Sequence, residues 1–233
     1  MAHLKRYVMP KSWPLAVKEE KFVIRPMPGP HSLKKCLPLQ VVLRNILGIA
    51  ETAAEARQIL NTRKVMIDKT VRTALKFPVG LMDVIEIPEI KKQYRVSINS
   101  KGLFLEEIKQ SDADKKLCLI TGKKTLRGGK EQLNLHDGNN IIIDKGKYNT
   151  MDSVVISLPD KKVVGHNKLE KGSPAFIFSG KNMGISGIIT KVKTRSSMTE
   201  KSTVTIKSDK KEVETLKEYI FVGDPSSAGK VKK

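Results

Sequence analysis

The sequence predicts an α+β protein of several small domains, in which a helix-containing module precedes antiparallel β structure. Two short amphipathic helices and two strands fall between Pro38 and Pro88. From Gln93 onward, short apolar runs are divided by turn residues, which is typical of small antiparallel barrels and sandwiches. A chain of 233 residues can hold two or three small hydrophobic cores.

Residues 1–36 predict an extended basic arm. They contain five prolines and neither a helical nor a strand period, and proline lacks the N–H that regular structure uses. Such an arm should be ordered only by the surface on which it lies. Tyr7, Trp13 and Phe22 alternate with lysine and arginine, a mixture that suits base stacking and phosphate contact on RNA. An idle tail is the competing interpretation.

Residues 37–90 contain two helices with one apolar stripe each. Residues 39–47 place apolar side chains at i, i+3, i+4, i+7 and i+8, and Gly48 should end this helix. The second helix should begin at Thr52, because Glu55 follows in the spacing of a capping box. The cations off both stripes or directly after the second helix should face solvent, namely Arg44, Arg57, Arg63 and Lys64.

The segments LRNILG, EARQIL, VMID and GLMDVIEI follow in order within residues 43–87, and the last two should be strands. In this order and spacing, residues 37–90 resemble the RNA-binding module named after ribosomal protein S4, whose core packs two helices on a small sheet. Pseudouridine synthases and one class of tRNA synthetases carry the same module. Arg63 and Lys69 stand where it usually has glycine, so the positive backbone angle must arise elsewhere or be adopted with strain.

Residues 91–171 predict a central antiparallel β domain. Tyr94, Val96 and Ile98 alternate with Arg95 and Ser97, and further apolar runs lie at residues 117–120, 133–135, 141–143 and 154–158. Runs of this length are typical of strands. Asp137-Gly138 stands between two of the runs and should form a tight hairpin turn.

Residues 172–222 predict a last β domain. Strands are expected at residues 175–178 and 188–192, and Gly180, Gly184 and Gly187 lie between them. This loop resembles the KOW motif, which implies an SH3-like barrel of the kind found in ribosomal proteins and transcription elongation factors. We expect its glycines to act through backbone geometry, with Gly187 at a positive φ that a β-branched residue would not tolerate. Residues 223–233 are a polar tail without a pattern that predicts structure.

Further segments extend a resemblance over nearly the whole chain. They are HLKRY at 3–7, PKSWP at 10–14, KFVIRPMPGPH at 21–31, GGKEQLNLHDGNN at 128–140 and SGKNMGISG at 179–187. Together they resemble the archaeal and eukaryotic small-subunit ribosomal protein S4e family, which is distinct from bacterial S4. This resemblance implies a structural, ribosomal-RNA-binding component of the cytoplasmic small subunit, with neighbouring ribosomal proteins as further partners and no catalytic activity or small-molecule substrate.

Composition independently favours nucleic acid as the partner. The formal net charge is +20 and the pI is near 9.9; such a chain repels itself, whereas a polyphosphate would neutralise it with release of counterions. Lysines that merely solubilise a surface are the alternative. A membrane partner is not expected, because no apolar run of about 18 residues and no apolar signal segment occur. Cys36 and Cys118 lack CxxC spacing, which fits a reducing compartment.

Residues that could suggest catalysis have simpler explanations. Residues 117–131 superficially resemble a phosphate-binding loop, but Glu131 follows Lys130 where a magnesium-binding hydroxyl is required. His136 and Asp137 adjoin a turn glycine, and no nucleophile is placed to join them. Neither His3 nor His166 has metal-ligand spacing. We therefore predict no catalytic residue, metal or cofactor.

The RNA-binding candidates are side chains of the arm, the helix pair, the basic loop after Thr121 and the KOW-like segment. They are Lys5, Arg6, Lys11, Trp13, Lys18, Lys21, Arg25, His31, Lys34, Lys35, Arg44, Arg57, Arg63, Lys64, Arg72, Lys123, Lys124, Arg127, Lys130, Lys181, Asn182, Lys191, Lys193 and Arg195. Two other functions compete. A pseudouridine synthase type of RNA-modifying enzyme would need a large catalytic domain with a G-R-L-D-like segment, which this sequence lacks. A KOW-bearing transcription factor would leave the arm and the helix pair unexplained.

Overall fold

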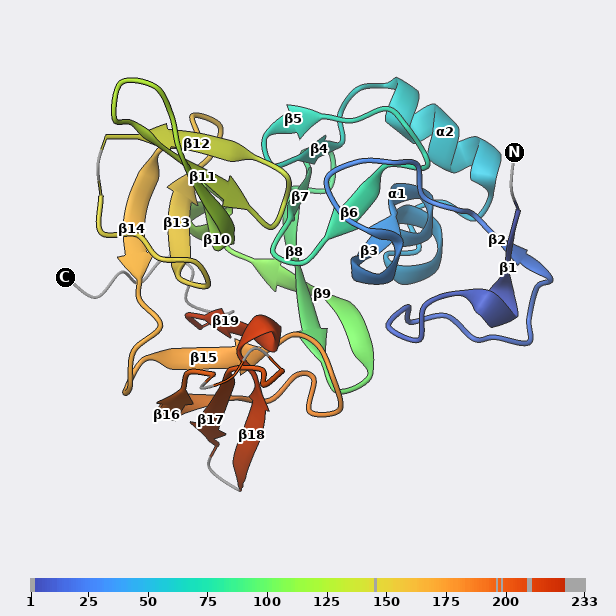
Figure 1. The fold of residues 1–233 in the computed structure, drawn as a ribbon. Coiled ribbons are helices and arrows are strands. Elements are labelled where there is room, and N and C mark those ends of the chain that lie inside the picture. Colours follow the sequence, from blue (N-terminus) through green and yellow to red (C-terminus); the bar gives the residue numbers. More distant parts are fainter. Residues whose placement is uncertain (1–2, 145, 196, 198, 209–210, 225–233) are drawn as a thin grey trace. The chain divides into compact units, whose positions relative to one another are not determined.

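The structure is a computed structural model that describes residues 3–144, 146–195, 197, 199–208 and 211–224 (Figure 1). The chain divides into two compact units, which are described one at a time. The first comprises the residues up to 97 together with 101–113, and the second comprises residues 98–100 and those from 114 onward. Most of the expected polar tail, from residue 225, lies outside the described residues.

The first unit combines short strands with a few helical segments. They are β1 (Leu4–Lys5), η1 (Arg6–Val8), β2 (Phe22–Val23), η2 (Leu33–Lys35), β3 (Cys36–Pro38), α1 (Leu39–Val41), η3 (Val42–Ile46), α2 (Ala53–Asn61), β4 (Met66–Ile67), β5 (Thr70–Val71), β6 (Pro78–Gly80), β7 (Val84–Ile87), β8 (Lys92–Asn99), β9 (Gly102–Ile108) and α3 (Gln110–Ala113).

The two predicted helices of the module are confirmed. The first begins as α1 and continues as the π-helical segment η3, in which the N–H of Leu47 donates to the carbonyl oxygen of Val42 (2.9 Å). Gly48 ends it at φ 64°, as a glycine past the last turn commonly does. In α2, the N–H of Glu55 donates to Thr52 Oγ1 (3.2 Å), which is one half of the expected cap. The helices bury aliphatic residues, with Leu43 and Leu60 fully inaccessible.

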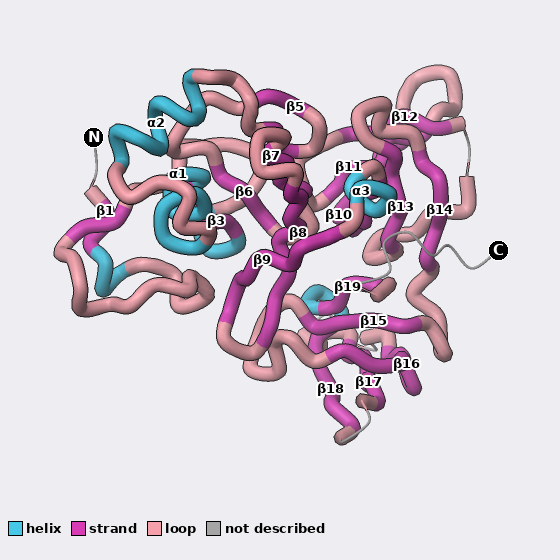
Figure 2. The backbone as a smooth tube through the Cα atoms, turned by 180° about the vertical axis from the view of Figure 1, so that it is seen from behind, coloured by secondary structure: helices cyan, strands magenta, loops and turns pink. Residues whose placement is uncertain are grey.

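The module's sheet extends past its predicted end. The strand order is β5-β4-β7-β8-β9, and β8 pairs with β7 antiparallel. Figure 2 shows β7, β8 and β9 following one another. We expected Pro88 to end the module near residue 90. The turn after Pro88 instead reverses the chain, because the N–H of Lys91 donates to the Pro88 carbonyl (3.1 Å) and Lys91 has φ 54°. Pro88 therefore starts a hairpin turn inside one sheet.

The N-terminal segment is folded onto the rest of its unit, which differs from the expected extended arm. β1 and β2 form a short hairpin, and Trp13 is only 3% exposed. The carbonyl of Ser12 accepts a hydrogen bond from the N–H of Leu103 (2.8 Å), and the N–H of Met27 donates to the carbonyl of Lys76 (2.8 Å). The prolines do not prevent this packing, since the segment uses single hydrogen bonds and a buried aromatic ring instead of a long ladder.

The second unit is almost entirely β structure. Its strands are β10 (Lys115–Thr125), β11 (Glu131–Leu135), β12 (Asn140–Ile143), β13 (Ser153–Ser157), β14 (Val163–Asn167), β15 (Pro174–Ile177), β16 (Ser186–Lys193), β17 (Thr203–Lys207), β18 (Glu212–Leu216) and β19 (Ile220–Val222), with a 3-10 turn η4 (Lys217–Tyr219) before the last.

These strands form two five-stranded sheets. In the order β12-β11-β10-β13-β14, the long β10 pairs with β13 along its first half and with β11 along its second half. The other sheet has the order β18-β17-β16-β15-β19, and all of its pairs are antiparallel. Each sheet has its own aliphatic core, around Ile120 and Ile156 in the first and around Ile177 and Ile206 in the second. The hairpin predicted at Asp137-Gly138 joins β11 to β12.

Candidate RNA-binding surface

Three of the four predicted cations of the helix pair lie on α2 and on the turn that follows it. Arg57, Arg63 and Lys64 are exposed, as predicted. Lys64 forms an ion pair with Glu89, whereas Arg57 and Arg63 have no ion-pair partner among the described residues. These two guanidinium groups are therefore available for phosphate contacts, which arginine makes in a bidentate manner.

Arg63 and Lys69, which stand where the module usually has glycine, both adopt positive φ. Arg63 has φ 58°, and Asp68 and Lys69 at the β4–β5 turn have φ 50° and 61°. Asp68 Oδ1 accepts a hydrogen bond from the N–H of Val84 (3.0 Å), and Lys69 Nζ lies 3.0 Å from the carboxylate of Glu86. These contacts offset the strain of the turn, which is on the order of 1–3 kcal/mol per residue.

Two further arginines of the module are less available than the sequence suggests. Arg44 is half-buried, and its guanidinium donates to Glu20 Oε1 (2.7 Å). Arg72 stacks on the ring of Phe77, with its guanidinium carbon 4.5 Å from the ring centroid. Both side chains already have partners within the chain, and this separates them from Arg57 and Arg63.

The N-terminal segment divides its candidates between surface and interior. The exposed ones are Lys5, Lys11, Lys18, Lys21, Arg25, Lys34 and Lys35. Arg6 and Trp13 are each 3% exposed, and Arg6 is bound to Glu19 (2.8 Å). Their RNA contact was expected from the mixture of rings and cations, but burial removes both from the surface. They hold the segment in place instead.

His31 is also buried, in a bond that fixes the segment to the module. Its Nε2 lies 3.0 Å from Asp83 Oδ2, and the N–H of Gly80 donates to the same oxygen (2.8 Å). A Cβ at Gly80 would lie 2.3 Å from the imidazole, so only glycine leaves room for the ring. Between RNA contact and a structural role, the geometry favours the structural role.

The thiol of the neighbouring Cys36 is also buried. Its burial, and to a smaller extent the negative charge of Asp83, raise the pKa of the thiol to about 12.

The loop between β10 and β11 presents the cations that its sequence predicted. Lys124, Arg127 and Lys130 are exposed, while Lys123 pairs with Glu131 (2.9 Å). Gly128 and Gly129 have φ 84° and 75°, and an added Cβ would meet nothing within 4 Å. These glycines therefore serve the tight turn and not a close packing contact.

The C-terminal sheet exposes its candidates along β16 and the adjoining loops. Lys181, Lys191, Lys193 and Arg195 face solvent, whereas Asn182 is half-buried. Lys193 pairs with Glu214 (3.3 Å). The pKa of Glu214 is lowered, chiefly by a hydrogen bond from Thr203 and next by the hydrogen bond and positive charge of Lys193.

The glycines of this loop fit the prediction in two of three cases. Gly180 and Gly184 have φ 91° and 86°. Gly187 is not among the residues with positive φ, so that part of the prediction is wrong. Gly187 is needed because β17 passes close to it: an added Cβ would lie 2.3 Å from the carbonyl oxygen of Lys207 on that strand.

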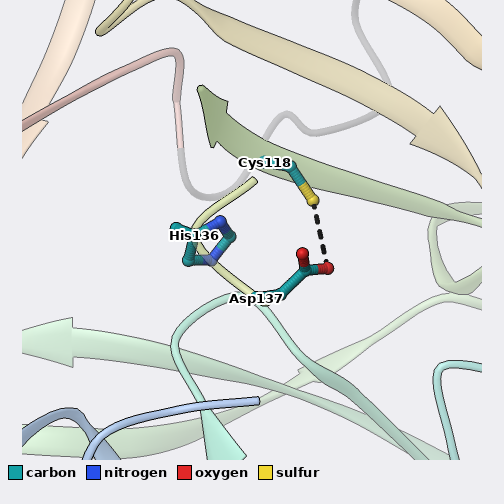
Figure 3. A group of neighbouring side chains, drawn as sticks. All are labelled: Cys118, His136 and Asp137. Atoms are coloured by element: carbon teal, nitrogen blue, oxygen red, sulfur yellow. Dashed lines mark hydrogen bonds between the residues drawn. The ribbon is translucent and has the colours of Figure 1, made fainter. Parts of the chain in front are cut away.

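A buried polar cluster lies beside the Asp137-Gly138 turn (Figure 3). The ligand atoms of Cys118, His136 and Asp137 lie within 4.8 Å of one another, and Cys118 Sγ donates to Asp137 Oδ2 (3.7 Å). The fully buried ammonium of Lys116 lies 3.1 Å from the same oxygen. A metal ion would have to displace this cation, so the donor set fits a structural ion pair. Burial raises the pKa of Asp137, but Lys116, His136 and Asn139 outweigh it and bring the pKa to about 2.

Comparisons with known proteins agree with the order of these parts. Residues 2–34 match the RS4NT domain, residues 37–85 the S4 domain and residues 90–163 the ribosomal family S4e. The matched domains define a ribosomal protein with an S4-type module. In the described residues, no helix is long and apolar enough to cross a bilayer.

Relatives over the whole chain identify the family. The small ribosomal subunit protein eS4 of Archaeoglobus fulgidus is 41% identical over 221 residues, covering 94% of this chain and 92% of that protein. That of Methanosphaera stadtmanae is 42% identical over 221 residues, covering 94% and 91%. The crystal structure of the 30S ribosomal protein S4e from Thermoplasma acidophilum superposes with a TM-score of 0.70 at 28% identity, over 81% of this chain and 94% of that one. The chain belongs to the eS4 family, which is structural and not enzymatic.

Proposed function

We propose that this chain is a structural component of the small ribosomal subunit, which binds and organises ribosomal RNA in the cytoplasm. The observation that supports this best is the distribution of charge. The buried cations Arg6 and Lys116 pair with carboxylates of the same chain, and buried Arg95 donates to the carbonyl of Asp112, whereas most other lysines and arginines among the described residues are exposed, on both units. Each exposed cation can neutralise a phosphate and release a counterion.

The mechanism follows from the separation of these cations along the chain. Arg57 and Arg63, the loop around Lys130 and the strand around Lys191 belong to different elements, so they can contact different RNA segments. Duplex RNA hides its sequence in a deep major groove, and recognition should therefore depend on shape, riboses and loops. Neighbouring ribosomal proteins are expected as further partners.

We propose in addition that the C-terminal sheet is an SH3-like barrel with a KOW-type loop. The five antiparallel strands β15–β19 and the positive φ of Gly180 and Gly184 support this proposal. The loop side chains Lys181 and Asn182 would then be RNA contacts. The boundaries 1–36, 37–90, 91–171 and 172–222 remain the proposed segments of the chain.

The test of the ribosomal role is quantitative mass spectrometry across a sucrose gradient of cell lysate. A structural component should follow the small subunit into polysomes at a constant ratio of about one copy, because many phosphate contacts must break together. A peak confined to free or precursor fractions, with no protein in polysomes, would overturn the proposal in favour of a transient assembly or modification factor.

A further inference from the structure

The segment around the β1–β2 pair, which we call the hairpin, exposes aromatic rings that a folded chain ordinarily buries. Tyr7 is 69% exposed and Phe22 is 45% exposed, although each ring offers a large apolar area for burial. Trp13 of the same segment is 3% exposed. The segment thus uses one ring to anchor itself and presents two rings to solvent.

The strand register and the ring contacts place these rings beside cations, with Phe22 in β2 and Tyr7 in η1. Lys5 is directly opposite Phe22 in the β1–β2 pair, and directly opposite residues share a face of the sheet. Lys5 Nζ lies 5.8 Å from the centroid of the Tyr7 ring, and Lys21 Nζ lies 5.6 Å from that of Phe22. The His3 ring lies 5.5 Å from the Phe22 ring. We call His3, Lys5, Tyr7, Lys21 and Phe22 the hairpin row.

The acidic side chains of the segment do not neutralise this row. Glu19 and Glu20 bind the buried Arg6, at 2.8 and 3.5 Å, and Glu20 also binds Arg44. Lys5 and Lys21 have no carboxylate partner among the described residues. The outer face of the hairpin is therefore both aromatic and cationic.

We infer that the hairpin row binds unpaired nucleotides of ribosomal RNA, with bases stacked on Tyr7 and Phe22 and phosphates held by Lys5 and Lys21. This inference rests on the proposed function and adds the class of RNA that this site takes. Bases inside a duplex are already stacked on each other, whereas unpaired bases offer a free π-face to a protein ring. A hydrophobic protein partner fits less well, because it would have to desolvate two ammonium groups that phosphates would pair with.

The test uses the full chain with fluorescently labelled RNA and measures Kd by anisotropy. The probes are a single-stranded oligoadenylate of about twelve nucleotides, within the range of known single-strand sites, and a duplex RNA of the same length. The variant Tyr7→Leu with Phe22→Leu keeps apolar bulk and removes both planar rings. It should bind the single strand about 25-fold or more weakly, since each of the two base stacks contributes about 5- to 150-fold. Its salt slope and its duplex affinity should stay unchanged.

Two control variants separate stacking from charge and from general apolar exposure. Lys5→Gln with Lys21→Gln should flatten the slope of log K against log salt by about 0.7 for each phosphate that the variant no longer neutralises. Ile142→Ala removes a side chain that is 59% exposed on β12 of the second unit, and should change neither affinity. Thermal unfolding by circular dichroism should show the same midpoint for every variant. As a measurement independent of folding, ultraviolet crosslinking of intact small subunits should join Tyr7 or Phe22 peptides to unpaired nucleotides.

The outcomes distinguish this inference from the ribosomal role. Equal single-strand affinity of the ring variant and the unchanged chain would refute the hairpin row as a stacking site and leave the ribosomal role intact. An equal loss of single-strand and duplex affinity would show that the face contacts only phosphates, which also refutes stacking. Crosslinks from the two peptides to a protein, without RNA, would assign the row to protein docking instead. Failure of the unchanged chain to bind ribosomal RNA at all would refute the proposed function itself.

Discussion

Gly187 is required for space between two paired strands, and Gly187→Ala should destabilise the C-terminal sheet. The added Cβ would lie 2.3 Å from the Lys207 carbonyl oxygen and 3.0 Å from Ile206 Cγ2. Carbon–oxygen distances between strands are ordinarily about 3.3–3.6 Å, so β17 must move by about 1 Å. Lys207 is held on both sides, opposite Ile188 and Glu212. Overpacking of this kind costs about 1–3 kcal/mol.

The measurement is the free energy of unfolding by chemical denaturation, followed by circular dichroism, with hydrogen exchange of the β16 and β17 amides as a local readout. A destabilisation of this size should lower the melting midpoint by about 2–4 °C per kcal/mol in a chain of this length. Fluorescence of the single tryptophan, Trp13, reports on the first unit and not on this sheet. Ser186→Ala, at the exposed preceding residue, should be nearly silent. Equal midpoints for the two variants, or unchanged exchange in β16, would refute the steric argument.

Three further predictions concern charge and titration. Arg57→Gln with Arg63→Gln should weaken binding to ribosomal RNA and reduce the slope of log K against log salt by about 0.7–0.9 for each phosphate left without its arginine. The control Gln58→Ala, on the same helix, should change neither the affinity nor the slope. An unchanged slope in the arginine variant would show that this face does not touch phosphate. The pKa of Asp137 is about 2 when folded and 3.8 in the reference state, so its ion pair should contribute about 2 kcal/mol above pH 4 that is lost as the pH falls through 2. Asp137→Asn should lose this acid dependence. It should cost up to about 3–5 kcal/mol at neutral pH, because buried Lys116 loses the Asp137 carboxylate. An equal loss of stability between pH 4 and pH 2 in that variant would contradict the assignment. The pKa of Cys36 near 12 keeps its thiol neutral at pH 8. Iodoacetamide at that pH should therefore label Cys36 only after unfolding. Rapid labelling of the native protein, detected by mass spectrometry, would show that the site opens.

The elements with a strong local signal were predictable from the sequence. The stripe of residues 39–47, the cap at Thr52 and the turn at Asp137-Gly138 each depend on residues close in the chain, and each is present in the structure. The strands that were not predicted are β1, β2, β3, β5, β6, β9, β14, β17, β18 and β19. Several of them mix charged and apolar residues, as in Glu212–Leu216, and gain their strand conformation from pairing with a neighbouring strand.

The buried charges could not be found by local pattern. Alternation along residues 94–98 would place Arg95 and Ser97 toward solvent, yet they are 1% and 3% exposed. The guanidinium of Arg95 donates to the carbonyl of Asp112 (2.9 Å), a residue of the following helical turn. Burial lowers the pKa of Arg95, and Glu106 and Asp112 oppose this. A period of two shows which residues share a face, but it does not show that both faces are covered.

The division between buried and exposed cations explains how one chain can fold alone and still bind a polyanion. Arg6 and Lys116 are neutralised by carboxylates at 2.8 and 3.1 Å, and Arg95 donates to the carbonyl of Asp112, so folding does not leave them as isolated buried charges, which would be costly. The exposed excess repels itself instead, and this repulsion is screened over about 10 Å at 0.1 M salt. Added salt should therefore stabilise the free chain slightly while it weakens RNA binding steeply. If all exposed lysines were paired with carboxylates, as Lys64 and Lys193 are, both salt effects would be small. Opposite signs of the two effects in the same salt titration are expected if the exposed cations are the ones that RNA neutralises.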